Sequence, residues 1–171
     1  MQHSYQFQHG HVFLRPLEER DIEALRILRN RNRFFFNKVD YITSEQQKKW
    51  FIRYISQKND IMFAIELLCC PGEFVGAIAL YNIDEKAKTA EFGRVLLDKN
   101  KVSRKGIGTE AVTAVCRIAF ERLGLKKVTA EVLKTNQPAF RAYAKAGCIV
   151  VGENKKSWKL EITPDTMGEK R

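Results

Sequence analysis

Long apolar runs are the first feature that this 171-residue sequence lacks. No stretch of about 18 apolar residues occurs, so the sequence predicts no membrane-spanning helix of ordinary length. The N-terminal residues also lack a charged segment followed by an apolar one, which is the layout of a secretory signal. We therefore expect a cytoplasmic protein without a membrane partner.

Cysteine and histidine are also few, and they are not spaced as metal ligands. The four cysteines form no Cys-x-x-Cys pair, and the three histidines all lie within the first eleven residues. Structural zinc sites and disulfide frameworks are recognised by paired ligands at short, regular spacing. We expect no metal ion, and we interpret the cysteines as small buried apolar residues.

Acidic residues are outnumbered by basic ones. The chain has 20 Asp and Glu residues against 30 Lys and Arg residues, which gives a net charge of +10. An excess of this size favours anionic partners, namely nucleic acid, an acidic membrane surface or a phosphorylated small molecule. The apolar content of 44% is ordinary for a folded protein, and the length suits one domain over residues 1–171.

Hydrophobic periodicity predicts strands of period two and helices of period 3.6 along the whole chain. The expected strands are a short one before Pro16, then 61–69, 73–83, 89–97, 127–133, 148–154 and 157–163. The expected helices are 21–30, 42–55, 111–123 and 137–146. Asp21 is expected to cap the first helix, Thr43 and Gln46 form a capping-box pattern at the second, and the tail 164–171 is expected to fray.

The order of these elements predicts the fold class. A helix joins strand 89–97 to strand 127–133, and a crossover of this kind makes two strands parallel. Short polar turns join most of the other strands, which favours antiparallel neighbours. We predict a mixed α/β (α+β) fold with a central, mostly antiparallel sheet of about seven strands and four helices on both faces.

A glycine-containing loop, SRKGIG at 103–108, lies between an expected strand and an expected helix. Gly106 and Gly108 remove side chains that would block a ligand, and the N–H groups that begin the helix can bind an anion. Arg104 and Lys105 add positive charge at the same place. The pattern is typical of a phosphate-binding loop, although a glycine turn that only redirects the chain has the same short motif.

This loop and two further segments resemble the GNAT superfamily of CoA-dependent N-acetyltransferases. SRKGIG matches the family signature Q/R-x-x-G-x-G/A, except that Ser103 stands where the family has Gln or Arg. NQPAFRAYAKAGC at 136–148 resembles the family's N-x-x-A-x-x-x-Y-x-x-x-G-[FC], and FLRPLEERDIEAL resembles its first strand and helix. The resemblance implies direct acetyl transfer from acetyl-CoA to a primary amine.

The resemblance also implies contacts with acetyl-CoA. Asn136 would bond to the pantetheine arm, and the glycine loop would hold the pyrophosphate. A bulge in strand 89–97, for which Gly93 is the candidate, would free a backbone N–H for the thioester carbonyl. The residues assigned to acetyl-CoA are Ser103, Arg104, Lys105, Gly106, Ile107, Gly108, Thr109, Asn136 and Leu96.

Tyr143 is the candidate general acid, because the resemblance places it beside the thioester sulfur and a phenol can protonate a leaving thiolate. A tyrosine of the helix core would show the same spacing. Glu91 and Glu131 are both candidates for the general base, since each interrupts an apolar strand near the expected site. A base that acts through a water chain is also compatible with the sequence.

The segment RNRNRFFFN and the helix after it combine arginines with aromatic rings. They resemble the acceptor region of GNAT enzymes that acetylate amino sugars carried on nucleotides. Aromatic faces stack on sugars and bases, and guanidinium groups bind diphosphates. We therefore expect a nucleotide-linked amino-deoxy sugar as the small-molecule acceptor, bound by Arg29, Asn30, Phe35, Tyr41 and Trp50.

Other interpretations stay open. A solvated basic helix with phenylalanines in the core would give the same pattern. The GIGTEA stretch resembles N-terminal acetyltransferases of ribosomal proteins, whose acceptor is a protein N-terminus. A nucleic-acid-binding module and a non-catalytic CoA-binding fold belong to other classes. The basic residues are scattered and no known nucleic-acid-binding signature occurs, so we expect no nucleic-acid partner. The sequence is also compatible with a homodimer.

Overall fold

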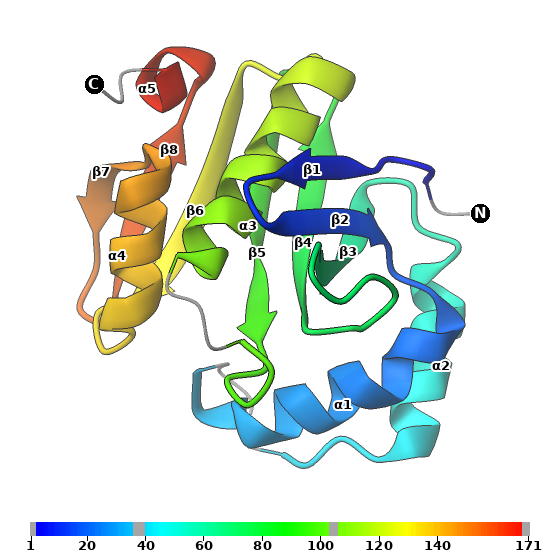
Figure 1. Ribbon diagram of the computed structural model, residues 1–171. Helices are drawn as coiled ribbons and strands as arrows, with labels where there is room; N and C mark the ends of the chain where they lie inside the picture. Colours follow the sequence, from blue (N-terminus) through cyan, green and yellow to red (C-terminus); the bar gives the residue numbers. More distant parts are fainter. Residues whose placement is uncertain (1–2, 36–39, 103–105, 169–171) are drawn as a thin grey trace.

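The computed structural model describes residues 3–35, 40–102 and 106–168, and within them it contains one sheet of eight strands. The strands lie in the order β1-β2-β3-β4-β5-β6-β8-β7 (Figure 1). Their bounds are Phe7–His9 (β1), Val12–Pro16 (β2), Asp60–Leu67 (β3), Gly76–Asp84 (β4), Thr89–Leu97 (β5), Lys127–Leu133 (β6), Ile149–Glu153 (β7) and Ser157–Ile162 (β8).

Five α-helices accompany the sheet in the described residues. They are Ile22–Arg31 (α1), Ser44–Tyr54 (α2), Ile107–Arg117 (α3), Gln137–Ala146 (α4) and Pro164–Gly168 (α5). Short 3-10 turns precede and follow α1, and a π-helical segment, Ile118–Arg122, continues α3. Thr43 and Gln46 form the expected capping box at the start of α2.

The pairing of the strands follows the sequence expectation. Every neighbouring pair is antiparallel except β5 and β6, which are parallel because α3 carries the chain back between them. β5 and β6 have the bounds that hydrophobic alternation predicts for them. The mixed, mostly antiparallel sheet is therefore confirmed.

Helices cover both faces of the sheet, as expected (Figure 1). Successive residues of β3 alternate between the two faces, as in any strand. Phe63 and Ile65 pack in a core under α3 and α4, whereas Met62 and Ala64 pack in a second core under α1 and α2. The described residues thus form two cores, one on each face of the sheet.

The sheet has one strand more than the seven expected from the sequence. The additional strand is β1, which has three residues and pairs with β2 across a turn at Gly10, where φ is +57°. So short a strand gives no hydrophobic periodicity to detect. A residue far away in the sequence stabilises this turn. The backbone N–H of His11 donates a hydrogen bond to the carboxylate of Glu110 on α3 at 2.7 Å.

The expectation that the tail frays is wrong for residues 164–168, which form α5 and raise the helix count above four. Thr163 and Thr166 exchange hydrogen bonds between hydroxyls and backbone N–H groups at 3.0 and 3.3 Å, which caps this helix. The end of α4 approaches α5 closely at Gly147. A Cβ there would lie 2.8 Å from the carbonyl oxygen of Thr166, so only glycine fits.

Asp21 stands at the start of α1 but does not cap the helix with its side chain. Its carboxylate accepts two hydrogen bonds from the guanidinium of Arg15, at 2.6 and 2.9 Å. Arg15 also donates to Glu66 of β3 at 2.5 Å, and all three side chains are buried. The bonds to Asp21 raise the pKa of Arg15, and the network fixes the start of α1 against β2 and β3.

Two of the four cysteines differ from the expectation. Cys116 and Cys148 are buried apolar residues as expected, whereas Cys69 and Cys70 are exposed. The difference arises because the exposed pair lies in the turn between β3 and β4, beyond the end of the buried strand.

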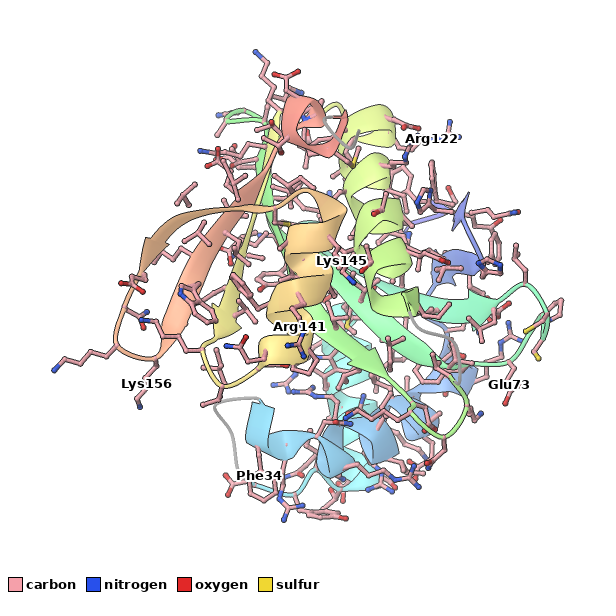
Figure 2. All side chains as sticks on the ribbon, turned by 60° about the vertical axis from the view of Figure 1, so that its left-hand side comes forward. Phe34, Glu73, Arg122, Arg141, Lys145 and Lys156 are labelled. Carbon is pink, nitrogen blue, oxygen red and sulfur yellow. The ribbon has the colours of Figure 1, made fainter. Side chains whose placement is uncertain are left out.

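Basic side chains are distributed over several elements of the surface. Arg122 ends the π-helical segment, Arg141 and Lys145 lie on α4, and Lys156 lies in the turn between β7 and β8 (Figure 2). All four are exposed. The surplus positive charge is therefore spread over separate elements, as the scattered pattern in the sequence indicates.

Candidate active site

The parallel strands β5 and β6 pair over only three residues. Thr89 to Glu91 faces Lys127 to Thr129, and beyond these residues the two strands no longer pair with each other. They diverge beyond this point (Figure 1), and a pocket of about 450 Å³ lies between them. The beginnings of α3 and α4 complete its walls. We call this cavity the cofactor pocket.

A bulge in β5 accompanies the divergence. Ala79 of β4 pairs with Gly93 and Ala77 pairs with Leu96, so three steps along β5 match two along β4. The irregularity includes Arg94, whose φ of +53° lies in the left-handed region. A bulge leaves the backbone of the extra residue outside the ladder, which suits a binding site for a carbonyl oxygen.

Gly93 lies next to the bulge and has a separate role from the one expected. A Cβ at this position would lie 2.7 Å from the hydroxyl of Tyr81. The absence of a side chain on Gly93 therefore allows the ring of Tyr81, on β4, to lie against β5 and to line the cofactor pocket. Burial, followed by the charge of Glu91, raises the pKa of Tyr81.

The start of α3 forms one wall of the cofactor pocket. Gly106 is its N-cap with φ of +100°, and an added Cβ would meet nothing within 4 Å. Ile107 is buried and anchors the first turn, Gly108 lines the pocket, and Thr109 follows as a half-buried residue. The remaining loop residues predicted to bind the cofactor, Ser103, Arg104 and Lys105, lie outside the described residues.

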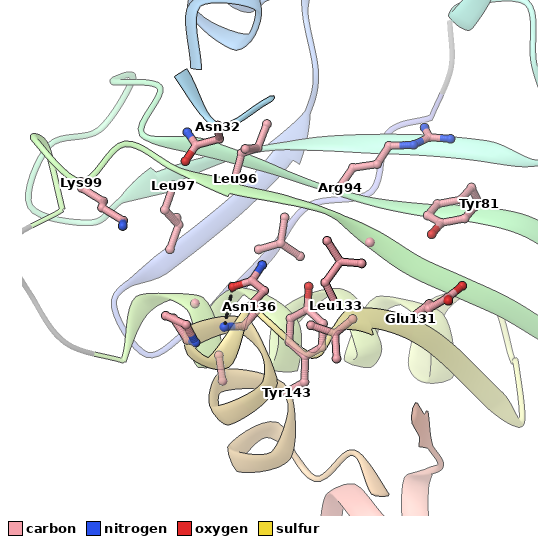
Figure 3. A pocket seen from close by; sticks show the side chains of 17 residues that line it. Asn32, Tyr81, Arg94, Leu96, Leu97, Lys99, Glu131, Leu133, Asn136 and Tyr143 are labelled. Carbon is pink, nitrogen blue, oxygen red and sulfur yellow. Dashed lines mark hydrogen bonds between the residues drawn. The ribbon is translucent and has the colours of Figure 1, made fainter. Parts of the chain in front are cut away.

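Helix α4 and its N-cap contribute Tyr143 and Asn136 to the wall of the same pocket (Figure 3). Asn136 is the N-cap of α4, and its side-chain oxygen accepts a hydrogen bond from the N–H of Ala139 at 3.3 Å. Because the oxygen caps the helix, the amide nitrogen is the group that Asn136 can present to a ligand.

Tyr143 is buried, and its ring packs edge-on against Phe92 with centroids 4.8 Å apart. Its hydroxyl has no hydrogen-bond partner among the described residues, and it points into the cofactor pocket (Figure 3). Burial raises the pKa of Tyr143 well above its usual value. The phenol therefore stays protonated at neutral pH and faces the cavity.

One of the two candidate general bases lines the cofactor pocket and the other does not. Glu131 lines the cofactor pocket at the end where Tyr81 lies (Figure 3), and it accepts hydrogen bonds from Ser157 and Asn154 of the β7–β8 region. Glu91 is not among the residues that line the pocket, and it accepts a hydrogen bond from Asn82 at 2.9 Å. The geometry brings Glu131, not Glu91, to the cavity wall.

Sequence reasoning missed Tyr81 and Arg94 as pocket residues. Leu96, assigned to the cofactor from the sequence, also lines the pocket. Tyr81 could have been noticed as an aromatic residue at the end of an apolar strand. The position of Arg94 depends on the bulge, for which the local pattern around Gly93 was the only available signal.

A second pocket of about 330 Å³ lies between α1 and α2, and we call it the basic pocket. Four of the five residues predicted to bind the acceptor line it, namely Arg29, Asn30, Tyr41 and Trp50. The side chain of the fifth, Phe35, lies outside the described residues. The neighbouring Phe34 is 68% exposed at the surface (Figure 2), which does not fit a phenylalanine of the core.

Asn30 shapes the basic pocket. Its side chain is buried and both of its amide groups bind the backbone of Ile42: Nδ2 donates to the carbonyl, and Oδ1 accepts from the N–H, each at 2.9 Å. Trp50 stacks on Tyr54 with ring centroids 5.2 Å apart. Gln47 is 1% exposed, and its Nε2 has no hydrogen-bond partner in the described part of the chain.

Metal and membrane sites receive no support from the described residues. Among them, no group of three or more His, Cys, Asp or Glu side chains could hold a metal ion. No helix in the same ranges combines the length and the apolar character needed to cross a membrane.

The family described as acetyltransferase (GNAT) domain matches residues 11–149. The chain belongs to this family. A probable N-acetyltransferase of Bacillus subtilis (strain 168), YjcK, is 32% identical over 158 residues, which cover 87% of this chain and 86% of YjcK. This GNAT protein is thus an acetyl-CoA-dependent N-acetyltransferase, as the resemblance implied.

Two solved structures are similar to this GNAT fold. FdhC, described as a nucleotide-linked sugar GNAT in its apo form, has a TM-score of 0.83 and 21% identity, covering 96% of this chain and 93% of FdhC. The spermidine N-acetyltransferase of Vibrio cholerae, in complex with CoA and spermine, has a TM-score of 0.81 and 18% identity, covering 92% and 98%. At these identities the likeness concerns the fold.

The cofactor pocket of this GNAT enzyme fits acetyl-CoA. The open space at Gly106 and the N-terminus of α3 suit a pyrophosphate. Apolar walls from Leu97, Val132 and Leu133 suit the pantetheine arm. Acetyl-CoA would supply the acetyl group as a thioester, and Tyr143 and Glu131 line the same pocket beside the bulge of β5.

We expect Gly108→Asp to weaken acetyl-CoA binding by about tenfold or more, because it places a carboxylate at the helix N-terminus that would face the pyrophosphate. Isothermal titration with acetyl-CoA measures the effect. Gly108→Ala is the matched control, since an added Cβ would lie at ordinary contact distances of 3.6 Å from Leu97 and 3.7 Å from Ala142. Equal affinity in both variants would place the pyrophosphate elsewhere.

Proposed function

We propose that the protein transfers the acetyl group of acetyl-CoA to the amino group of a nucleotide-linked amino-deoxy sugar. The observation that carries this proposal is the lining of the basic pocket. Three arginines, one aspartate and two aromatic rings surround one cavity beside the cofactor pocket: Arg29, Arg33, Arg53, Asp40, Tyr41 and Trp50. Guanidinium groups suit phosphates, and the aromatic faces suit a base or a sugar.

The basic pocket is positioned to present an acceptor to the acetyl group. Asn32, at the end of α1, lines the cofactor pocket, while Arg29 and Arg33 from the same end of the helix line the basic pocket. The end of α1 therefore contributes to both cavities, as a substrate that reaches from one to the other requires.

The charge of the basic pocket argues against a polyamine acceptor. A polycation such as spermidine would face three arginines and a single aspartate. Like charges in a partly dehydrated cavity repel strongly. FdhC, whose structure is similar to this one, is described as acting on a nucleotide-linked sugar, which agrees with an anionic acceptor.

Each group around the two pockets has a chemical role in this proposal. The bulge of β5 offers backbone donors for the carbonyl oxygen, and Tyr143 holds the proton for the departing sulfur. Glu131 accepts the proton of the attacking amine, directly or through water, because it lines the cavity at the end nearer Tyr81. Asn30 keeps the basic pocket in shape through its bonds to Ile42.

A substrate panel tests the proposed acceptor. We expect CoA release with nucleotide-linked amino sugars and turnover at least about tenfold lower with spermidine, because the arginines repel a polycation. Peptides that begin with ribosomal-protein N-termini complete the panel. Acetylation of the peptides or of spermidine, without transfer to any nucleotide-linked amino sugar, would refute the proposed acceptor but not the acetyltransferase activity.

We expect Tyr143→Phe to lower kcat by roughly 100-fold, since it removes only the proton donor. The hydroxyl has no partner among the described residues, so its loss breaks no described hydrogen bond, and acetyl-CoA affinity should be nearly unchanged. Single-turnover kinetics measure the chemical step. A decrease of less than about threefold in that step would remove Tyr143 from this role.

We expect Glu131→Gln to lower kcat/KM by about 100-fold, whereas Glu91→Gln, the matched control, should change it by less than about threefold. Glutamine can still accept the hydrogen bonds from Ser157 and Asn154, so the geometry is retained while the basicity is lost. The same assay on both variants decides between them. A larger loss in Glu91→Gln would move the base to Glu91, and two small losses would favour a water chain.

A further inference from the structure

Arg94 has a backbone conformation that residues other than glycine rarely adopt, with φ of +53° inside β5. Strained conformations persist where surrounding contacts fix them, and they gather at functional sites. Two side-chain contacts hold Arg94 in this backbone conformation. Nη1 donates to both carboxylate oxygens of Asp60, at 2.7 and 2.9 Å, and the guanidinium lies over Tyr81, 4.6 Å from the ring centroid.

These contacts leave part of the guanidinium available for a ligand. Within the described ranges, Nε and Nη2 of Arg94 have no hydrogen-bond partner, and the side chain is 36% exposed. Figure 3 shows Arg94 and Tyr81 at one end of the cofactor pocket, the end at which Glu131 also lies. An arginine in this position offers N–H donors to an anion that lies beside the reacting amine.

A second guanidinium approaches Arg94 from α1. Arg29 lines the basic pocket, and α1 packs against β5, which carries Arg94. Burial, and then the charge of Arg94, lowers the pKa of Arg29. Two guanidinium groups that lose water repel each other, and an anion between them relieves the repulsion. The space between these two guanidinium groups is therefore suited to an anionic group.

We infer that Arg94, which lines the cofactor pocket, and Arg29, which lines the basic pocket, together bind the diphosphate of the acceptor. The inference rests on the proposed function and makes Arg94 a specificity-determining residue for anionic acceptors. The nucleoside then lies against Trp50 and Tyr41, the diphosphate between the guanidiniums, and the amino sugar beside the bulge. The groups of a nucleotide-linked sugar follow one another in the same order.

The test removes the charge of Arg94 without leaving Asp60 unpaired. Arg94→Gln alone would leave a free carboxylate, which by itself would repel an anion, so the informative variant combines Arg94→Gln with Asp60→Asn. The matched control combines Arg20→Gln with Glu18→Gln. This exposed ion pair, at 2.6 Å, lines neither pocket.

Calorimetric titration of the CoA-saturated protein with uridine diphosphate and thymidine diphosphate measures binding on the acceptor side, because CoA already fills its own pyrophosphate site. We expect the Arg94 and Asp60 double variant, and Arg29→Gln alone, to weaken this binding by about tenfold or more. The control pair should stay within about twofold of the parent protein. CoA affinity should remain within about threefold in every variant.

The outcomes separate this inference from the proposed function. Unchanged nucleoside diphosphate binding in the double variant would overturn the inference and leave the proposed acceptor in place. If the parent protein binds neither nucleoside diphosphate and acetylates no nucleotide-linked amino sugar, both the inference and the proposed function are refuted. If the double variant loses CoA binding, Arg29→Gln decides, because Arg29 lies outside the cofactor pocket, and unchanged diphosphate affinity there contradicts the inference.

Discussion

One extra residue in β5 sets the geometry of the candidate active site. Paired parallel strands lie about 4.8 Å apart and leave no room between them for a substrate. At the bulge that includes Arg94, β5 bends, and its pairing with β6 has already ended at Glu91. The starts of α3 and α4, at Gly106 and Asn136, lie at the resulting gap and offer the N–H groups that helix N-termini leave unpaired.

The elements beside this gap could be predicted from the sequence, but the contacts across it could not. β5 and β6 alternate strongly and have the expected bounds, and α4 begins directly after Asn136 as expected, whereas α3 begins at Ile107 and not at residue 111. The pairing of Arg94 with Asp60 joins residues 34 positions apart and follows from a backbone conformation that no local pattern indicates. Alternation does not distinguish Glu91 from Glu131, whereas the pairing of β5 with β6 does. Glu91 lies in the paired part of the two strands, and Glu131 lies beyond its end at Thr129, where the strands diverge around the pocket.

The acceptor side shows a different limit. Resemblance to sugar-modifying relatives predicts Arg29, Asn30, Tyr41 and Trp50 as one group, and all four line the basic pocket because they come from α1, α2 and the segment between. The resemblance did not indicate which of these residues would face a ligand and which would hold the surrounding loop. Asn30 uses both groups of its side-chain amide to bind the backbone of Ile42. This role depends on where the loop places Ile42, and the residue type alone does not reveal it. Side-chain chemistry in a sequence therefore predicts membership of a site better than it predicts the role within it.

The division of the interior into two cores has an evolutionary consequence. The helices that begin at the cofactor pocket pack in one core, whereas α1 and α2, which carry the basic pocket, pack in the other core across the sheet. Substitutions in groups that share no contacts have additive effects. Substitutions deep in the core under α1 and α2 can therefore accumulate without disturbing the core under α3 and α4. The exceptions are positions that both sides share, such as Asn32 and Leu96, where a change on the side of α1 also alters the wall of the cofactor pocket.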